Sequence, residues 1–435
     1  MKKAVIIGSG AGGATAAKEL QGSFDVTLLE AGGPFHPFSQ PLSFMESCKK
    51  TGLFLDEREI QLLFPNMRIR KTGGKTGDRI VMVNGSGHGG TTPLSAGNAL
   101  RMDEDLRRLG FDLDDAFDEI NREINISTDH QKNWRQSTRQ LFDICQDMDL
   151  DPQPTPKMGD YQRCSHCGQC VLGCRSGVKW DSRRYLQIAV DRGVRLVSGC
   201  TADHIIIEQG KATGVMARHG LRNVFFPADL VVSAAGGFGT PAILERSGIA
   251  CDRTLFVDPV LCVAAEWKDC GQNREISMPF VMQREHAILS PYFDHLSFFF
   301  NKNWHIPAKD TLSLMIKLKD ETIGHVEADR RGTIRKELTG KDKERLQESV
   351  ALCQHIMRQV GIEPQNTFLG TINAGHPGGM LPLSRQEAAT YHSSRLPANV
   401  YVADATLLPA SLGNPPILTI IALAKKISRL CRDLK

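Results

Sequence analysis

The chain has 435 residues and a mass of 48.0 kDa, a length that predicts two or three domains. Hydrophobic residues make up 41% and charged residues 23%, which excludes a disordered protein. The 53 basic and 49 acidic residues leave a formal charge of +4, which is too small and too evenly spread to favour nucleic acid or a membrane surface as a partner.

The N-terminus predicts a strand rather than a targeting segment. The lysines at positions 2 and 3 and the apolar residues 4–7 imitate a signal peptide, but Gly8 interrupts them before an apolar core forms. No apolar run approaches the roughly 20 residues that cross a bilayer. We therefore expect a cytoplasmic protein without a transmembrane segment, whose 12 cysteines are thiols or metal ligands rather than disulfides.

The first thirty residues carry a dinucleotide-binding motif. They predict a strand, a glycine-rich turn, a helix and a second strand over residues 2–7, 8–13, 14–20 and 25–29. This is G-x-G-x-x-G in its required setting, with Glu30 about 20 positions on. Gly8 permits the tight turn, Gly10 lets the backbone approach a pyrophosphate, and Gly13 packs the helix on the sheet. Glu30 can accept hydrogen bonds from a ribose diol, but the motif does not separate FAD from NAD.

The chain then leaves this α/β pattern and later returns to it. The intervening segments begin with a second glycine-rich block (80–100), an amphipathic helix (101–123), a proline-rich connector (151–156) and a cysteine-rich segment (164–174). Short strands (194–240), an antiparallel region (255–335) with a half-buried strand at 311–319, and a second helix (341–360) follow. The return is the apolar strand 399–404, which ends in Asp404 near the expected cofactor crevice. Such an interrupted domain is more typical of flavoproteins than of simple nicotinamide dehydrogenases.

Two residues near the C-terminus are candidates for catalysis. His376 lies in a loop too glycine-rich for a helix or strand, and a near-neutral pKa suits it to take a proton from an alcohol. Asn414 and Pro415 precede a helix that begins near residue 417, so Asn414 is an expected N-cap. Its amide could also hold a substrate oxygen, while the helix dipole stabilises negative charge on a reduced flavin.

The cysteine-rich segment has the spacing C-x2-C-x2-C-x3-C, formed by Cys164, Cys167, Cys170 and Cys174. This is the spacing of a bacterial ferredoxin run and predicts a four-iron, four-sulfur (4Fe–4S) cluster. A structural zinc site is the main alternative, although zinc usually takes two C-x2-C pairs separated by a longer loop. The fourth ligand stays open between Cys174 and a distant cysteine, of which the candidates are Cys200, Cys251, Cys262 and Cys270.

These segments together resemble the glucose–methanol–choline (GMC) oxidoreductase family of FAD enzymes that oxidise alcohols. The resemblance runs nearly end to end and includes Glu30-Ala31-Gly32, the glycine block, the segment 234–249, His376-Pro377-x-Gly379 and Asn414-Pro415. The cysteine run, followed by Gly177-x-Lys179, resembles a bacterial subset of the family. Two departures are a chain shorter than usual and Ser86 where an arginine is common.

The resemblance implies roles for particular residues. His376 would be the catalytic base, and Asn414 would bond the substrate oxygen. Further FAD contacts would come from the glycine block, from Ala202 through its backbone near the adenine, from the second family signature and from the C-terminal segment, at Gly87, Gly89, Gly90, Thr91, Asn98, Ala202, Ala235, Gly236, Asp404 and Pro415.

The expected fold is therefore α/β, with a Rossmann-like FAD-binding domain interrupted by a substrate domain on an antiparallel sheet. Its parts are three pieces of the FAD-binding domain (1–150, 191–254 and 371–435), an iron–sulfur segment (151–190) and the substrate domain (255–370). The expected enzyme transfers hydride from an alcohol to flavin N5 and sends electrons singly through the cluster to a ferredoxin or quinone. The alternatives are a reductase acting on a carbonyl or activated alkene, and a non-catalytic electron-transfer flavoprotein or redox sensor.

Overall fold

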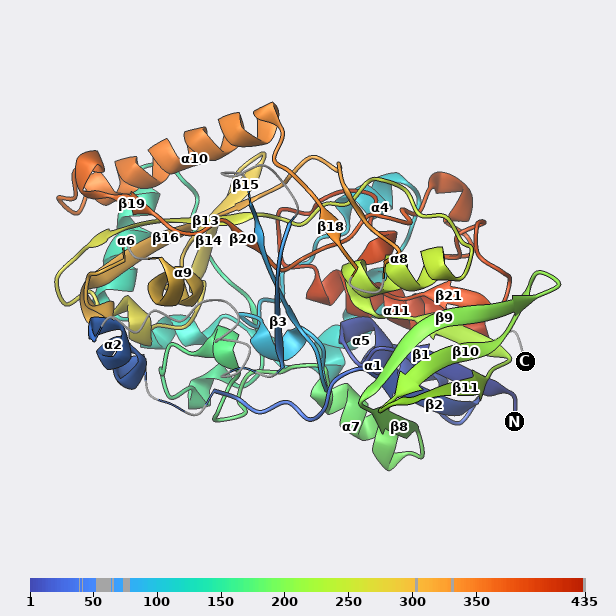
Figure 1. Cartoon of the computed structure of the whole chain (residues 1–435). Coiled ribbons are helices and arrows are strands. Elements are labelled where there is room, and N and C mark those ends of the chain that lie inside the picture. Colours follow the sequence, from blue (N-terminus) through green and yellow to red (C-terminus); the bar gives the residue numbers. More distant parts are fainter. Residues whose placement is uncertain are drawn as a thin grey trace.

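A five-stranded parallel sheet holds the N-terminal motif (Figure 1). The computed structural model describes residues 1–38, 40, 42–51, 64, 66–72, 79–301, 304–329 and 332–432. The spatial order of the sheet is β21–β12–β1–β2–β8, with bounds Val400–Val402, Leu230–Ser233, Lys3–Ile7, Asp25–Glu30 and Arg195–Ser198. Ile6 of β1 pairs with Val232 on one side and Leu28 on the other. Strands β12 and β21 are buried at every residue and β1 at every residue but Lys3, because helices cover this part of the sheet.

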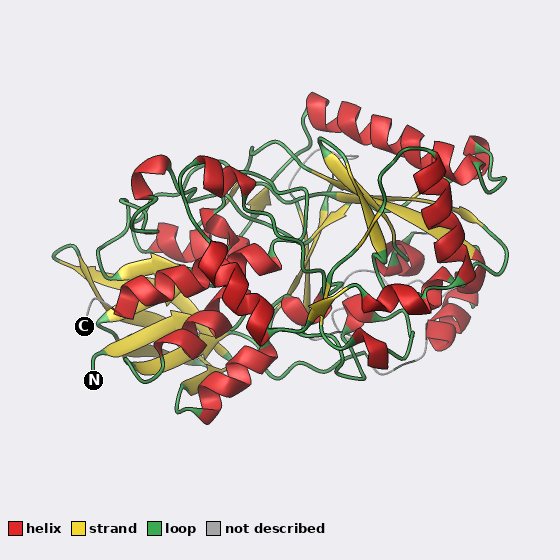
Figure 2. Ribbon diagram, turned by 180° about the vertical axis from the view of Figure 1, so that it is seen from behind, coloured by secondary structure: helices red, strands yellow, loops and turns green. Residues whose placement is uncertain are grey.

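Helices from distant parts of the sequence lie against this sheet, as the view from behind shows (Figure 2). Helix α1 (Ala11–Leu20) contacts α11 (Ile417–Arg432) and α7 (Arg183–Asp191), and α11 contacts α5 (Asp114–Glu123). The final helix therefore packs on the first one, which brings both ends of the chain to the same half of the molecule.

A three-stranded antiparallel sheet extends the same half. It consists of β9 (Cys200–Glu208), β10 (Lys211–His219) and β11 (Arg222–Pro227). Helix α8 (Gly236–Arg246) starts just after β12 and contacts β9.

The other half is built on a larger sheet that is antiparallel except where β20 pairs with β4. The order is β3–β4–β20–β13–β16–β15–β14–β6, with bounds Met67–Lys71, Val81–Gly85, Asn373–Ala374, Val260–Glu266, Thr311–Leu318, Ala287–Pro291, Phe280–Gln283 and Gln153–Pro154. Strand β19 (Phe368–Leu369) pairs with β13 off this path. Helix α10 (Gly340–Arg358) contacts β16 and α6 (Gln136–Asp147).

The remaining elements are short. They are helices α2 (Leu42–Lys50), α4 (Glu104–Arg108) and α9 (His295–Phe300). Two short strand pairs are β5 (Ile126–Ser127) with β7 (Lys157–Met158), and β17 (His325–Val326) with β18 (Ile334–Arg335). In the part of the chain that the structure describes, no helix is both long enough and apolar enough to cross a bilayer.

The predicted α/β fold with a second, antiparallel half is confirmed. Two details differ from the expectation. Strand β16 is buried along its whole length rather than on one face, because its Met315 and Lys317 side faces a cavity between the halves. Strands β3 and β4 lie within the range 1–150 assigned to the FAD-binding domain, yet they hydrogen-bond into the large sheet. The domain division as a whole stays a prediction.

Candidate active site

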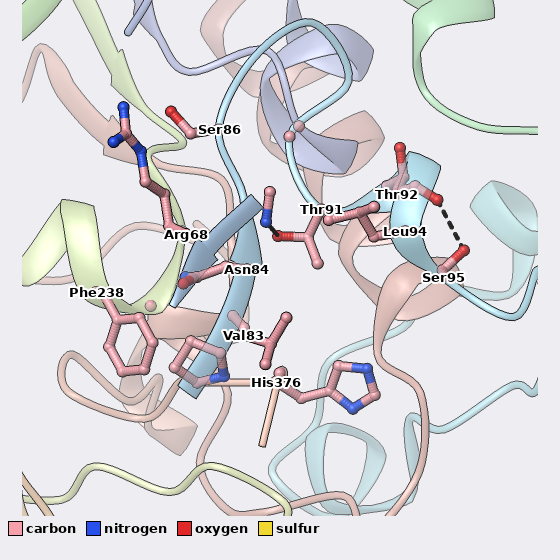
Figure 3. Close-up of a pocket in the computed structure, with 18 of the residues that line it drawn as sticks. Arg68, Val83, Asn84, Ser86, Thr91, Thr92, Leu94, Ser95, Phe238 and His376 are labelled. Atoms are coloured by element: carbon pink, nitrogen blue, oxygen red, sulfur yellow. Dashed lines mark hydrogen bonds between the residues drawn. The ribbon is translucent and has the colours of Figure 1, made fainter. Parts of the chain in front are cut away.

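A cavity of about 600 Å³ lies between the two halves, a volume that suits a small-molecule or cofactor site. Its walls come from the turn after β1, the glycine-rich block, the start of α8, strand β16 and the loops around residues 376 and 415. Figure 3 shows Arg68 and Ser86 at one end of this space, and Phe238 and His376 at the other. Segments more than 300 residues apart in the sequence therefore form one wall.

The turn after β1 is shaped by close backbone packing. A Cβ on Gly12 would lie 1.5 Å from the carbonyl oxygen of Ala403, and one on Gly13 would lie 1.8 Å from that of Gly8. A Cβ on Gly10 would meet nothing nearer than 3.9 Å and lies on the cavity wall. The turn thus leaves open, at Gly10, the surface that a pyrophosphate needs.

Two carboxylates, those of Glu30 and Asp404, hold the loops next to this surface by hydrogen bonds. Glu30, at the end of β2, accepts hydrogen bonds from Ser9 N (2.9 Å) and Ser9 Oγ (2.6 Å) through one oxygen and from Gly32 N (2.9 Å) through the other. Asp404 Oδ2 accepts from Gly236 N (2.8 Å) and from the Thr240 hydroxyl (2.6 Å), which ties β21 to the start of α8. Burial raises the pKa of Asp404, although these hydrogen bonds oppose the rise. The carboxylate acceptor at Glu30 and the open turn at Gly10 fit the ribose and the pyrophosphate of an FAD molecule.

Most of the predicted site residues lie on this cavity. Those on its wall are Gly8, Gly10, Glu30, Gly90, Thr91, Asn98, Ala202, Ala235, Gly236, His376, Asp404 and Pro415. The predicted residues that are not on its wall are Gly13, Gly87, Gly89, Asn414 and the four cysteines of the run. The roles assigned to all of these residues stay predictions.

His376 reaches the cavity from the loop after β20. Its side chain is 25% exposed, and its Nδ1 lies 3.5 Å from Asp258 Oδ2, too far for a good hydrogen bond and without another partner. Burial and the nearby Lys317 ammonium lower the pKa of His376 to about 4, although Asp258 opposes this. The imidazole is therefore neutral at neutral pH, which is the state that a general base requires.

The sequence analysis missed Asp258 and Lys317. Lys317 Nζ lies 2.5 Å from Asp258 Oδ2, and both side chains are buried against the cavity. Burial tends to raise the pKa of Asp258, but Lys317 and His376 hold it at about 2. The available signal was Lys317, a lysine between the apolar residues Ile316 and Leu318 of a predicted strand.

Asn414 is placed differently from the expectation. Helix α11 begins at Ile417, and within the described part of the chain the hydrogen bonds of the Asn414 side chain do not go to its first turn. The amide of Asn414 exchanges hydrogen bonds with Gln283, at 3.1 and 3.3 Å, and donates to the Leu412 carbonyl. The structure therefore does not bring the Asn414 amide to the cavity beside His376.

The four cysteines lie together beside the cavity. Val171 and Leu172, within the run, are on its wall. Burial raises the pKa of Cys164 to about 12, and the charges of Cys167, Cys170 and Cys174 contribute. Among the described residues, no group of three or more His, Cys, Asp or Glu side chains is arranged to hold a metal ion. The iron–sulfur cluster and its fourth ligand stay predictions.

The chain is similar to several known proteins. A family model described as GMC oxidoreductase matches residues 3–273. An uncharacterised protein of Methanocaldococcus jannaschii is 26% identical over 98% of both chains. A long-chain-alcohol oxidase of Arabidopsis thaliana is 27% identical over 59% of this chain and 36% of its own length. A crystal structure of pyridoxine 4-oxidase from Mesorbium loti superposes with a TM-score of 0.74 at 15% identity, covering 99% of each chain.

Proposed function

The chain belongs to the GMC oxidoreductase family, and from this premise we propose that it is an FAD-dependent dehydrogenase that oxidises an alcohol to a carbonyl. The observation that carries the proposal is the neutral imidazole of His376 on the same cavity as the glycine-rich turn. The similarity to a long-chain-alcohol oxidase and to pyridoxine 4-oxidase supports an alcohol as the substrate class.

The chain's own residues have distinct tasks in this reaction. Gly10, the N-terminal turn of α8 and Asp404 would hold the diphosphate side of FAD, and Glu30 would hold the adenosine ribose. Bound FAD would supply the hydride acceptor for the carbinol carbon. His376 Nε2 takes the hydroxyl proton, so the C–H bond breaks as the C=O bond forms. Asn414 would hold the substrate oxygen only after its two hydrogen bonds with Gln283 break.

The test is flavin reduction by a panel of alcohols in rapid-mixing experiments on the FAD-loaded protein. We expect His376→Ala to slow reduction at least about a hundredfold, on the usual scale for a general base. His219→Gln, an exposed histidine on β10, is the matched control and should leave the rate unchanged. An unchanged rate in His376→Ala would contradict the assignment.

We further propose that the cysteine run binds a 4Fe–4S cluster that takes electrons singly to a ferredoxin or quinone. Two buried lysines beside the run support a strongly negative group there. Among the described residues, Lys157 Nζ donates to Ala96 O, Asn98 Oδ1 and Ser277 O, and Lys179 Nζ to the carbonyls of Pro93, Ser95 and Cys170. Burial lowers the pKa of both lysines, and the charges of Cys170 and of one carboxylate each, Glu275 for Lys157 and Asp181 for Lys179, oppose this. A buried ammonium needs compensating charge, and four thiolates would provide it.

The same lysines support a connection between the cysteine run and the flavin site. Lys179 joins the carbonyl of Cys170 to the 93–95 turn, and Lys157 joins Asn98 to Ser277. The spacing of the run favours Cys174 as the fourth ligand, because only three residues separate it from Cys170. The proposal includes the division of the chain into FAD-binding, iron–sulfur and substrate segments.

The cluster is tested by measuring iron, acid-labile sulfide, zinc and flavin in anaerobically purified protein, with an EPR spectrum after dithionite. About four irons and four sulfides per FAD, with a signal from the reduced cluster, are expected. One zinc without sulfide would contradict the cluster and make the run a structural site. Flavin that no alcohol reduces, but that exchanges electrons with a partner protein, would instead favour an electron-transfer flavoprotein.

A further inference from the structure

A buried ion pair lies directly behind His376. Lys317 Nζ is 2.5 Å from Asp258 Oδ2, and the two side chains are 2% and 0% exposed. The same carboxylate oxygen lies 3.5 Å from His376 Nδ1, while the other accepts hydrogen bonds from the Ser411 hydroxyl (2.5 Å) and Gly413 N (3.3 Å). One carboxylate oxygen thus faces both a fixed cation and the catalytic ring.

The backbone of Asp258 is held in place at some cost. Its φ is +49°, a left-handed conformation that is unfavourable for a non-glycine residue. The N–H groups of Val257 and Asp258 donate to the carboxylate of Asp320, at 3.2 and 2.9 Å, and Asp320 pairs with Lys336 at 2.7 Å with both side chains fully buried. Buried ion pairs contribute little to stability compared with apolar packing, so two of them in series behind a cavity point to a functional requirement.

We propose that Asp258 and Lys317 are positioning residues for His376. Asp258 accepts a hydrogen bond from the Nδ1–H group and so leaves the Nε2 lone pair facing the substrate, and Lys317 neutralises the charge of Asp258 so that the ring stays uncharged. This inference rests on the proposed role of His376 as the base. Hydrogen bonds of catalytic groups are often long before substrate binds, and the 3.5 Å contact would then shorten.

The proposal leaves the protons and electrons of the reaction balanced. The hydroxyl proton moves to His376 Nε2, and the hydrogen of the carbinol C–H leaves with its electron pair to the flavin. Asp258 stays ionised and Lys317 stays protonated throughout. Since the pair has no net charge, it can orient the ring without drawing a second proton onto it.

Removing Lys317 and removing the charge of Asp258 should shift the pKa of His376 in opposite directions. Within the described part of the chain, the charged groups that act on His376 are Asp258 and Lys317, and Asp320 and Lys336 form the next ion pair. Without Lys317, the uncompensated carboxylate favours the imidazolium, so the pKa of His376 rises. With an amide in place of the Asp258 carboxylate, the remaining ammonium disfavours the imidazolium, and the ring also loses the acceptor that fixes its tautomer.

The experiment compares Lys317→Met, Lys317→Arg and Asp258→Asn in the FAD-loaded protein. Lys319→Met is the matched control, because it removes the same charge two residues away at a side chain that is 40% exposed. Two readouts are the pH dependence of flavin reduction and the pH dependence of His376 carbethoxylation by diethyl pyrocarbonate, measured without alcohol by mass spectrometry.

We expect Lys317→Met to move both acid limbs upward by at least about one pH unit, which is a tenfold change in the proton affinity of the ring. Lys317→Arg should restore the original profile. Asp258→Asn should slow flavin reduction on the order of a hundredfold or more without moving the acid limb upward. If Lys317→Met does not fold, Lys317→Gln makes the same comparison, since it removes the charge and keeps a donor to Asp258.

Identical profiles for Lys317→Met (or Lys317→Gln) and Lys319→Met would overturn the role of Lys317. A rate for Asp258→Asn within about threefold of the unsubstituted protein would overturn the role of Asp258. Failure of the proposed function is a separate outcome: His376→Ala would then leave flavin reduction unchanged, while the carbethoxylation profiles would still report whether the ion pair controls the ring.

Discussion

Gly10 precedes helix α1 and Gly12 lies in its first turn, and a methyl group at each would meet very different surroundings. At Gly10 the nearest atom to an added Cβ is 3.9 Å away, on the cavity side of the turn. At Gly12 the added Cβ would lie 1.5 Å from the backbone oxygen of Ala403, next to β21. Substituting each glycine with alanine should therefore separate cofactor binding from folding.

The expected magnitudes follow from these distances. An ordinary contact needs about 3.4 Å or more, so Gly12→Ala must push α1 roughly 2 Å away from Ala403, and we expect a loss of about 3 kcal/mol or more in the free energy of unfolding. Gly10→Ala should stay within about 1 kcal/mol of the unsubstituted protein, because alanine restricts the unfolded chain without a clash. The same methyl group stands where the pyrophosphate would approach the backbone, so FAD affinity should fall at least about tenfold.

The assays are urea unfolding of the FAD-free proteins and fluorescence titration of each with FAD. Gly12→Ala should unfold at a lower urea concentration, and Gly10→Ala should unfold normally but bind FAD weakly. The reasoning is refuted if Gly10→Ala binds FAD with unchanged affinity, or if FAD-free Gly12→Ala is as stable as the unsubstituted protein.

Three further predictions concern buried polar groups. Lys425 is 1% exposed and binds three glutamates of α1 and α5, so Lys425→Met should cost about 2 kcal/mol in urea unfolding, and a second change, Glu19→Gln, should recover part of it. Burial and the charge of Lys157 lower the pKa of His130 to about 4. The folded protein therefore favours neutral His130, and the free energy of unfolding falls as the pH drops from 6.5 toward 4, by about 2 kcal/mol at pH 5. His130→Gln can keep both hydrogen bonds and should show a smaller loss between pH 7 and pH 5 in urea unfolding; an equal loss would contradict the assignment. Asp404→Ala strips the acceptor from Gly236 N and the Thr240 hydroxyl, so calorimetry should show a lower Tm and FAD titration a weaker Kd, whereas Asp404→Asn should have the smaller effect.

Local sequence patterns were sufficient to predict the N-terminal motif, the fold class and the family. The turn at 8–13 and Glu30 predicted the strand–turn–helix unit and its parallel sheet, because glycine spacing and a buried apolar strand restrict the backbone within a few residues. The family, the fold class and the FAD-dependent enzyme class were predictable for the same reason, and all three are confirmed. The C-terminal helix was also predicted from a local pattern and begins at Ile417, but the Asn414 side chain bonds Leu412 and Gln283, the latter a contact that no local pattern encodes.

What the sequence determined by itself is therefore the cofactor-binding motif, the family and the presence of His376 and four closely spaced cysteines. Only the tertiary structure decided which groups meet at the cavity. Asp258, Lys317 and His376 come from the segment before β13, from β16 and from a loop after β20, and the Asn414 amide meets Gln283 of β14. Such encounters follow from the pairing of strands far apart in the chain, which no local pattern encodes. The ionisation of His376 follows in turn from burial and neighbouring charge, which exist only once those strands have paired.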